Sequence, residues 1–215
     1  MTPRDTFNKL TARQRDEILD RYRYYNTDHL DWWDNVYENF RAEMEAVGIE
    51  VDQIYFSGFS SQGDGACFEG RVQDWPKFLT SVGYTCPALI ALAEQVWTLS
   101  VRHSGRYYHE NCTLFTYDAD NPNNYTEFEW DEFVYRNSPY STDIQNATFW
   151  AVLRKYDFAK LEEEFRAEFK SHMRTLYNDL RSEFEHLTSD EAVLEGLIAN
   201  GLLSETINEL EETYA

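Results

Sequence analysis

The sequence contains few cysteines and no long apolar run. Its 215 residues include 3 Cys, and no two of them have the CxxC spacing of a zinc or redox site. We therefore expect Cys67, Cys86 and Cys112 to be reduced thiols, with neither a metal nor a cofactor bound. No stretch approaches the roughly 18 apolar residues that cross a membrane. Because Met1–Asp5 also lack the apolar segment of a secretion signal, we expect a cytoplasmic protein.

Basic side chains are scarce as well. Lys and Arg total 19 against 39 Asp and Glu, which gives a formal net charge of −20. Such a field repels nucleic acid and anionic membranes, so we expect neither as a direct partner, and it attracts basic protein surfaces. Aromatic side chains are abundant, with 6 Trp, 15 Tyr and 14 Phe. They can bury large areas, so the chain is expected to fold around a core.

Hydrophobic periodicity changes twice along the chain. Residues 1–48 are predicted to be helical, 49–135 mainly β with inserted helices, and 145–215 helical with an acidic end. The predicted strands include Val51–Phe59, Ala66–Val72, Trp97–Ser104 and Arg106–Tyr117, and the longest predicted helix is Phe158–Leu187. This segregated order favours a single α+β domain over residues 1–215, with a mostly antiparallel sheet of about four or five strands.

The most distinctive segment lies between the first two predicted strands. Its glycines allow a backbone to approach a ligand closely, and its polar side chains offer hydrogen bonds: Ser57, Ser60, Ser61, Gln62 and Asp64. The simpler interpretation is a hairpin whose glycines supply the positive φ of its turn. The segment lacks the Lys-Ser/Thr ending of a phosphate-binding P-loop, so the class of any ligand stays open.

Other arrangements for chemistry are weak. Cys67 could act with His103 or His109 if their strands are neighbours. The two histidines could also bind a metal with Glu110 or Asp118. No ligand spacing or nucleophile motif supports either arrangement. These observations favour a protein that is not an enzyme.

Carboxylates concentrate in two segments. From Ser182 to Ala215 there are nine acidic residues and no Lys or Arg. We assign partner binding to Glu183, Glu185, Asp190, Glu191, Glu195, Glu209, Glu211 and Glu212, and to a mid-chain group, Glu127, Glu129, Asp131 and Glu132. The ordinary interpretation is a solvated face. The sharper one is that these carboxylates imitate the phosphates of DNA and occupy a basic channel in another protein. Tyr107, Tyr108 and Trp130 are candidate aromatic anchors.

The string SGFSSQGDGACFEG, within Phe56–Gly70, resembles a signature of uncharacterised bacteriophage and prophage proteins. The resemblance implies a viral accessory protein that acts in the host cytoplasm. Small acidic accessory proteins of this kind often antagonise restriction or CRISPR systems. We therefore predict a non-enzymatic inhibitor of a basic, nucleic-acid-handling host protein. Two alternatives stay open: a small-molecule or nucleotide-binding protein, or an enzyme, that uses Ser57–Gly65, and an assembly protein that oligomerises through its long helix.

Overall fold

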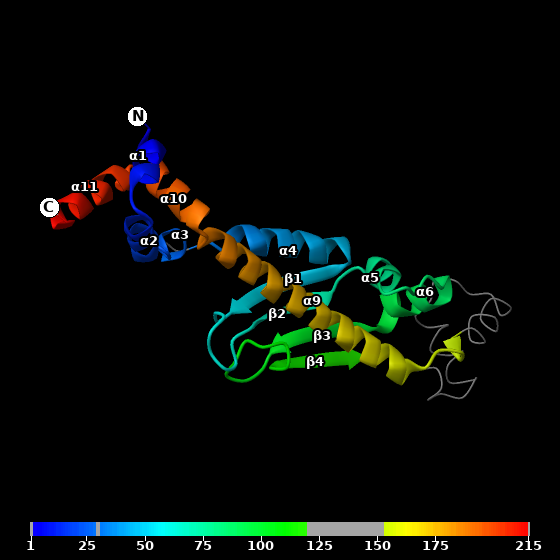
Figure 1. The fold of residues 1–215 in the computed structure, drawn as a ribbon. Helices are drawn as coiled ribbons and strands as arrows, with labels where there is room; N and C mark the ends of the chain where they lie inside the picture. Colours follow the sequence, from blue (N-terminus) through cyan, green and yellow to red (C-terminus); the bar gives the residue numbers. More distant parts are fainter. Residues whose placement is uncertain (1, 29–30, 120–152, 215) are drawn as a thin grey trace. The chain divides into compact units, whose positions relative to one another are not determined.

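The computed structural model describes residues 2–28, 31–119 and 153–214 (Figure 1). They confirm the predicted α+β class, with helices before and after one antiparallel sheet of four strands. We expected one domain over residues 1–215. The structure instead groups the chain into two compact units. The helical unit combines Met1–Val36 with Asn178–Ala215, and the sheet unit comprises Tyr37–Tyr177.

The sheet has the strand order β1-β2-β3-β4, and each strand is antiparallel to the next. The strands are β1 (Ile49–Phe56), β2 (Ala66–Val72), β3 (Thr98–His103) and β4 (Thr113–Asp118). The bounds of β2 are those predicted. Strand β4 begins later than the predicted Arg106, because the chain turns between the strands and the Ser104 N–H donates to the Cys112 carbonyl at 2.7 Å.

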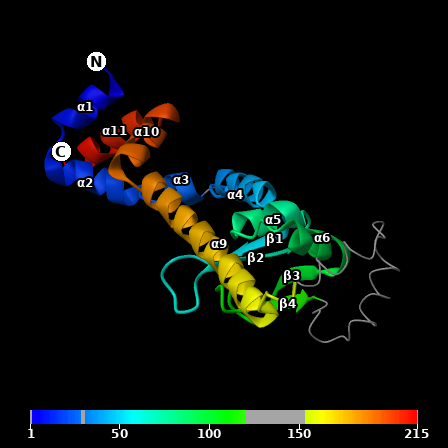
Figure 2. The same ribbon diagram turned by 90° about the vertical axis from the view of Figure 1, so that its right-hand side faces the viewer.

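Helix α9 (Phe158–Leu187) has the bounds predicted and supplies the apolar face that covers the sheet. Figure 1 shows it running diagonally across the strands, and Figure 2 gives the view turned by 90°. Phe169 is 1% exposed, and its ring centroid lies 5.7 Å from that of Phe68 on β2 and 5.8 Å from that of Phe115 on β4. Phe165, one turn earlier on the same helical face, is fully buried.

Shorter helices pack against this aromatic layer. They are α4 (Asp34–Ala46), α5 (Trp75–Ser81) and α6 (Pro87–Val96). Phe40 on α4 meets Phe68 with ring centroids 5.4 Å apart, and Phe78 on α5 meets Phe165 at 5.2 Å. Gly48 (φ +83°) joins α4 to β1, and a Cβ there would lie 2.2 Å from the Asp74 carbonyl oxygen. Only glycine fits this close approach.

The helical unit is built from segments at both ends of the sequence. Its helices are α1 (Pro3–Lys9), α2 (Ala12–Arg21), α3 (Tyr25–Asp28), α10 (Asp190–Ala199), α11 (Leu202–Tyr214) and the end of α9. A shared core joins the two segments: Phe7, Ile18 and Leu19 from the first, and Val193, Leu194, Leu197, Leu203, Ile207 and Leu210 from the second. Neither segment could bury this apolar surface alone.

The helix starts follow local rules, with one difference from the prediction. Threonine favours the N-cap position, and Thr11 caps α2 with a capping box that Gln14 completes. Within residues 1–48 the apolar stripe predicts a second helix from about His29 to Ala46, and α4 begins only at Asp34. Asp31 adopts φ 88°, in the left-handed region that interrupts a helix, so both tryptophans precede α4.

Replacing Phe169 with alanine tests the dependence of the sheet unit on α9. We expect Phe169→Ala to lower the free energy of unfolding by about 3–5 kcal/mol, because it leaves a cavity between the helix and two strands. Denaturant unfolding measures this change. The exposed Glu163→Ala on the same helix is the control and should change stability by about 0.5 kcal/mol or less. Equal effects of the two variants would contradict this packing.

Candidate functional site

The loop from Ser57 to Gly65 connects β1 and β2 and is closed by hydrogen bonds within itself. The Ser57 N–H donates to the Gly65 carbonyl at 3.2 Å, and the Gly65 N–H donates to the Ser57 hydroxyl at 3.3 Å. Tyr177, in helix α9, donates its hydroxyl proton to the Gly58 carbonyl at 3.2 Å. The helix that covers the sheet therefore also fixes the start of this loop.

Asp64 organises the loop from inside. One of its carboxylate oxygens accepts hydrogen bonds from the backbone N–H groups of Ser60 at 2.8 Å and Ser61 at 2.7 Å. The Asp64 N–H donates to the Ser61 carbonyl at 3.1 Å, which completes the turn. The side chain that we predicted to bind a ligand thus has a structural role.

Two glycines allow the loop to pack against the connection between β3 and β4. A Cβ on Gly63 (φ +97°) would lie 2.6 Å from the Tyr107 ring, and one on Gly65 would lie 2.9 Å from the His109 Cα. Such distances require the neighbours to shift, so close packing accounts for both glycines. No ligand is needed to explain this pattern.

The exposed polar side chains of this loop are Ser57, Ser60, Ser61 and Gln62. Beside it, Tyr107 is 48% exposed, and the Arg106 guanidinium carbon lies 5.9 Å from its ring centroid. The predicted anchor Tyr107 is therefore accessible, in an ordered loop. The alternative hypothesis of a ligand loop now depends on the three exposed serines and the glutamine.

An aromatic cluster lies at the same end of the sheet. The Tyr55 ring centroid lies 5.0 Å from that of His103 and 5.3 Å from that of Tyr108. Burial, followed by the charge of Glu69, raises the pKa of Tyr55. His103 Nε2 lies 3.2 Å from the Tyr107 carbonyl oxygen, so the histidine already has a backbone partner.

The cysteines are all free, and they differ in environment. Cys67 is buried, whereas Cys86 and Cys112 are half-buried. Burial raises the pKa of the Cys67 thiol to about 12, which disfavours a nucleophile activated by His103 or His109. Within residues 2–28, 31–119 and 153–214, no three His, Cys, Asp or Glu side chains gather as metal ligands would. Among the described helices, none is long and apolar enough to cross a membrane.

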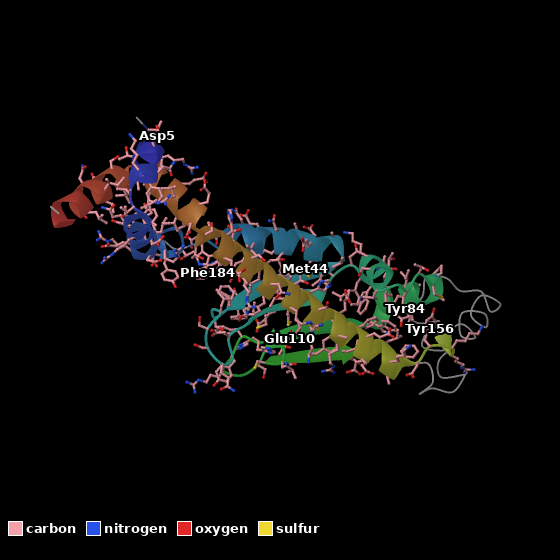
Figure 3. All side chains as sticks on the ribbon, in the orientation of Figure 1. Asp5, Met44, Tyr84, Glu110, Tyr156 and Phe184 are labelled. Atoms are coloured by element: carbon pink, nitrogen blue, oxygen red, sulfur yellow. The ribbon has the colours of Figure 1, made fainter. Side chains whose placement is uncertain are left out.

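Sequence reasoning missed a polar cluster at the start of α6. Burial opposes ionisation of Cys86, but the neighbouring Leu89 N–H, Tyr156 hydroxyl and Ala88 N–H favour the thiolate, and together they lower its pKa. Tyr84 donates a hydrogen bond to Glu164, and the rings of Tyr84 and Tyr156 have centroids 6.1 Å apart (Figure 3). The signal that could have pointed to this cluster is Pro87 directly after Cys86, because proline at the first position marks a helix start and so places Cys86 at the N-cap.

Alkylation with iodoacetamide tests the contrast between these thiols. Because the thiolate is the reactive form, the lowered pKa of Cys86 should make it react at lower pH than Cys67, whose raised pKa and burial protect it. We expect Cys86 to be modified first in the native protein and Cys67 only on unfolding, as measured by peptide mass spectrometry. Cys86→Ser identifies the fast-reacting site. Modification of Cys67 at the same rate as Cys86 would contradict these environments.

A second prediction concerns the carboxylate of Asp64. Asp64→Ala should lower the free energy of unfolding by about 1–3 kcal/mol, because two backbone N–H groups lose a charged acceptor. Thermal unfolding of both proteins measures the difference. Ser61→Ala is the matched control, since it removes an exposed hydroxyl and keeps the N–H that Asp64 accepts. A loss of stability in the control as large as in Asp64→Ala would refute this role.

The carboxylates predicted near the C-terminus lie in the helical unit, and several pair with arginines of the N-terminal segment. Arg4 lies 2.5 Å from Glu191 and 3.8 Å from Glu195. The other pairs are Arg23 with Asp190 at 2.5 Å and Arg21 with Glu209 at 3.6 Å. Part of the acidic segment thus complements the chain's own basic segment, which the spacing of acids alone does not reveal.

Other carboxylates of the helical unit have no such partner. Glu183, Glu185 and Glu205 form no ion pair among the residues that the structure describes. The remaining predicted carboxylates lie outside the described residues or side chains: Glu127, Glu129, Asp131, Glu132, Glu211 and Glu212. The predicted anchor Trp130 lies outside them too, whereas Tyr108 packs in the aromatic cluster at the sheet end.

A family model described as a domain of unknown function (DUF8835) matches residues 32–190. No curated protein and no solved structure matches the chain. The matched residues include the whole sheet unit with its Ser57–Gly65 loop. Helices α1 to α3 and α11, and nearly all of α10, lie outside the match. Most of the helical unit therefore lies outside the match.

Proposed function

The chain belongs to the DUF8835 family, and we propose that it is a non-enzymatic accessory protein of a phage or prophage. It binds a basic surface of a host nucleic-acid-handling or defence protein and inhibits it. It acts in the cytoplasm of the bacterial host, and its exposed carboxylates occupy positions that DNA phosphates would otherwise take. The phage-like string within Phe56–Gly70 supports this context.

One observation carries the proposal: the helical unit holds far more carboxylates than its own cations can neutralise. It contains 7 Lys and Arg against 17 Asp and Glu, which leaves a formal charge of 7 − 17 = −10. Three of its arginines already form ion pairs within the unit. The excess charge on this small helical body attracts a basic partner and accelerates its association.

The geometry favours binding over catalysis at the sequence-predicted sites. Asp64 is engaged by backbone N–H groups, and burial raises the pKa of Cys67 to about 12. Carboxylates on helices, in contrast, stand at fixed intervals along a rigid scaffold. Such spacing suits recognition of regularly placed cations on a DNA-binding surface.

The experiment neutralises the unpaired carboxylates of the helical unit. The variant Glu183→Gln/Glu185→Gln/Glu205→Gln should bind the basic partner captured from a bacterial host about tenfold more weakly at low salt, equivalent to about 1.4 kcal/mol. Its affinity should also depend less on salt than that of the unmodified chain. Isothermal titration at several salt concentrations, with duplex DNA as competitor, measures both effects.

The matched control makes the same charge change in the sheet unit. Glu38, Glu94 and Glu163 are exposed and form no ion pair in the described part of the chain. Their triple replacement by Gln should weaken binding less than the first triple variant. Equal losses from both, or a partner whose binding is indifferent to DNA and salt, would count against the proposal.

A further inference from the structure

Four aromatic side chains gather in the helical unit, apart from its buried core. The Tyr24 ring is stacked on that of Phe184 with centroids 6.2 Å apart, and the Trp32 ring lies 5.7 Å from Phe184. Trp33 meets Trp32 edge to face at 5.5 Å. Figure 3 labels Phe184, near the end of α9. We call these residues the aromatic patch: Tyr24, Trp32, Trp33 and Phe184.

The side chains of the aromatic patch are more exposed to solvent than those of the unit's core. Tyr24 is 55% exposed, and Trp32, Trp33 and Phe184 are half-buried. Core residues of the same unit, such as Ile18 and Leu197, are fully buried. Leaving a large aromatic ring half in water forgoes the free energy of burying it, and exposed aromatic clusters characteristically mark contact surfaces.

The local backbone explains why these rings are not absorbed into helical packing. Tyr24 lies beyond the end of α2, after the C-cap Tyr22. The left-handed conformation of Asp31 (φ 88°) holds the tryptophans in a turn before α4. Only Phe184 belongs to a long helix. Three of the four rings thus come from connecting segments, where partner-contacting residues are often found.

The segments that carry the patch are rich in carboxylates. Asp28, Asp31 and Asp34 belong to the segment that carries the tryptophans, and Glu183 and Glu185 flank Phe184 in the sequence. Within the described residues, none of these five carboxylates forms an ion pair.

The cations nearest to the patch in sequence are Arg23 and Arg181. Arg23 is engaged by Asp20 at 2.9 Å and by Asp190, and Arg181 has contacts of its own. The segments that carry the aromatic rings thus also carry carboxylates without an ion pair, and an aromatic face itself attracts a cation.

We propose that the aromatic patch receives a Lys or Arg side chain of the basic partner, with Tyr24 as the ring that the cation covers. This inference rests on the proposed function and adds the residue that contacts the partner's cation. The carboxylates attract the partner from a distance, and the aromatic faces bind one cation at short range. Tyrosine and tryptophan suit this role because they offer large rigid surfaces with few rotatable bonds.

The test measures binding of a fluorescein-labelled arginine-rich peptide to the full chain by anisotropy. Tyr24→Leu should weaken binding about three- to tenfold, because it removes the aromatic face, and Tyr24→Phe should keep most of the affinity. Neither change alters charge, so the dependence of affinity on salt should stay that of the unmodified chain. Unfolding curves of both variants confirm that the helical unit is intact.

The matched control is Leu114→Ala, which removes an apolar side chain that is 59% exposed in the sheet unit. It should leave peptide affinity unchanged. A Tyr24→Leu effect no larger than that of the control overturns the anchor, and so does an equal loss in Tyr24→Phe.

Glu183→Gln/Glu185→Gln separates this inference from the proposed function. If that pair weakens binding while Tyr24→Leu does not, electrostatic recognition stands and the aromatic anchor fails. If neither change affects binding, both fail.

Discussion

The packing of α9 on the sheet is the interaction on which the sheet unit depends. Phe169 contacts β2, β4 and α5, so one side chain joins elements that are far apart in the chain. Strands of six to eight residues do not form a stable sheet without a covering layer. The same helix supplies Tyr177, which hydrogen-bonds to the loop at Gly58. Stability and the position of the loop therefore have one source, and a change in α9 affects both.

In the helical unit, charge and apolar burial have different roles. The ion pairs of Arg4, Arg21 and Arg23 are solvent-exposed, and such pairs contribute roughly 0–1 kcal/mol each. The shared apolar core supplies most of the stability, while the ion pairs favour one alignment of the two segments over others. Because few cations are present, this alignment leaves most carboxylates unneutralised. One acidic segment thus contributes both to assembly and to the surface that a partner would meet.

The elements that the sequence predicted well are those with strong periodicity. Helix α9 and strand β2 have the predicted bounds, and Thr11 caps α2 as its residue type favours. The misplaced start of α4 reflects one backbone conformation at Asp31, which propensity does not reveal. The role of Asp64 could not be derived either, because it depends on how the loop folds back on its own amides. The pairing of Arg4 with Glu191 joins residues far apart in the chain, so composition alone suggested a uniformly acidic segment.

The discontinuous core of the helical unit has a consequence for the order of synthesis. Helices α1 and α2 leave the ribosome before the sheet unit, and the residues that cover Ile18 and Leu19 follow after it. Helices α1 and α2 therefore lack the core residues of α10 and α11 while the sheet unit is being synthesised. Their side-chain caps at Thr2 and Thr11 satisfy backbone groups locally, with no help from the missing segment. The nascent chain can thus begin these two helices before α10 and α11 emerge and complete the shared core.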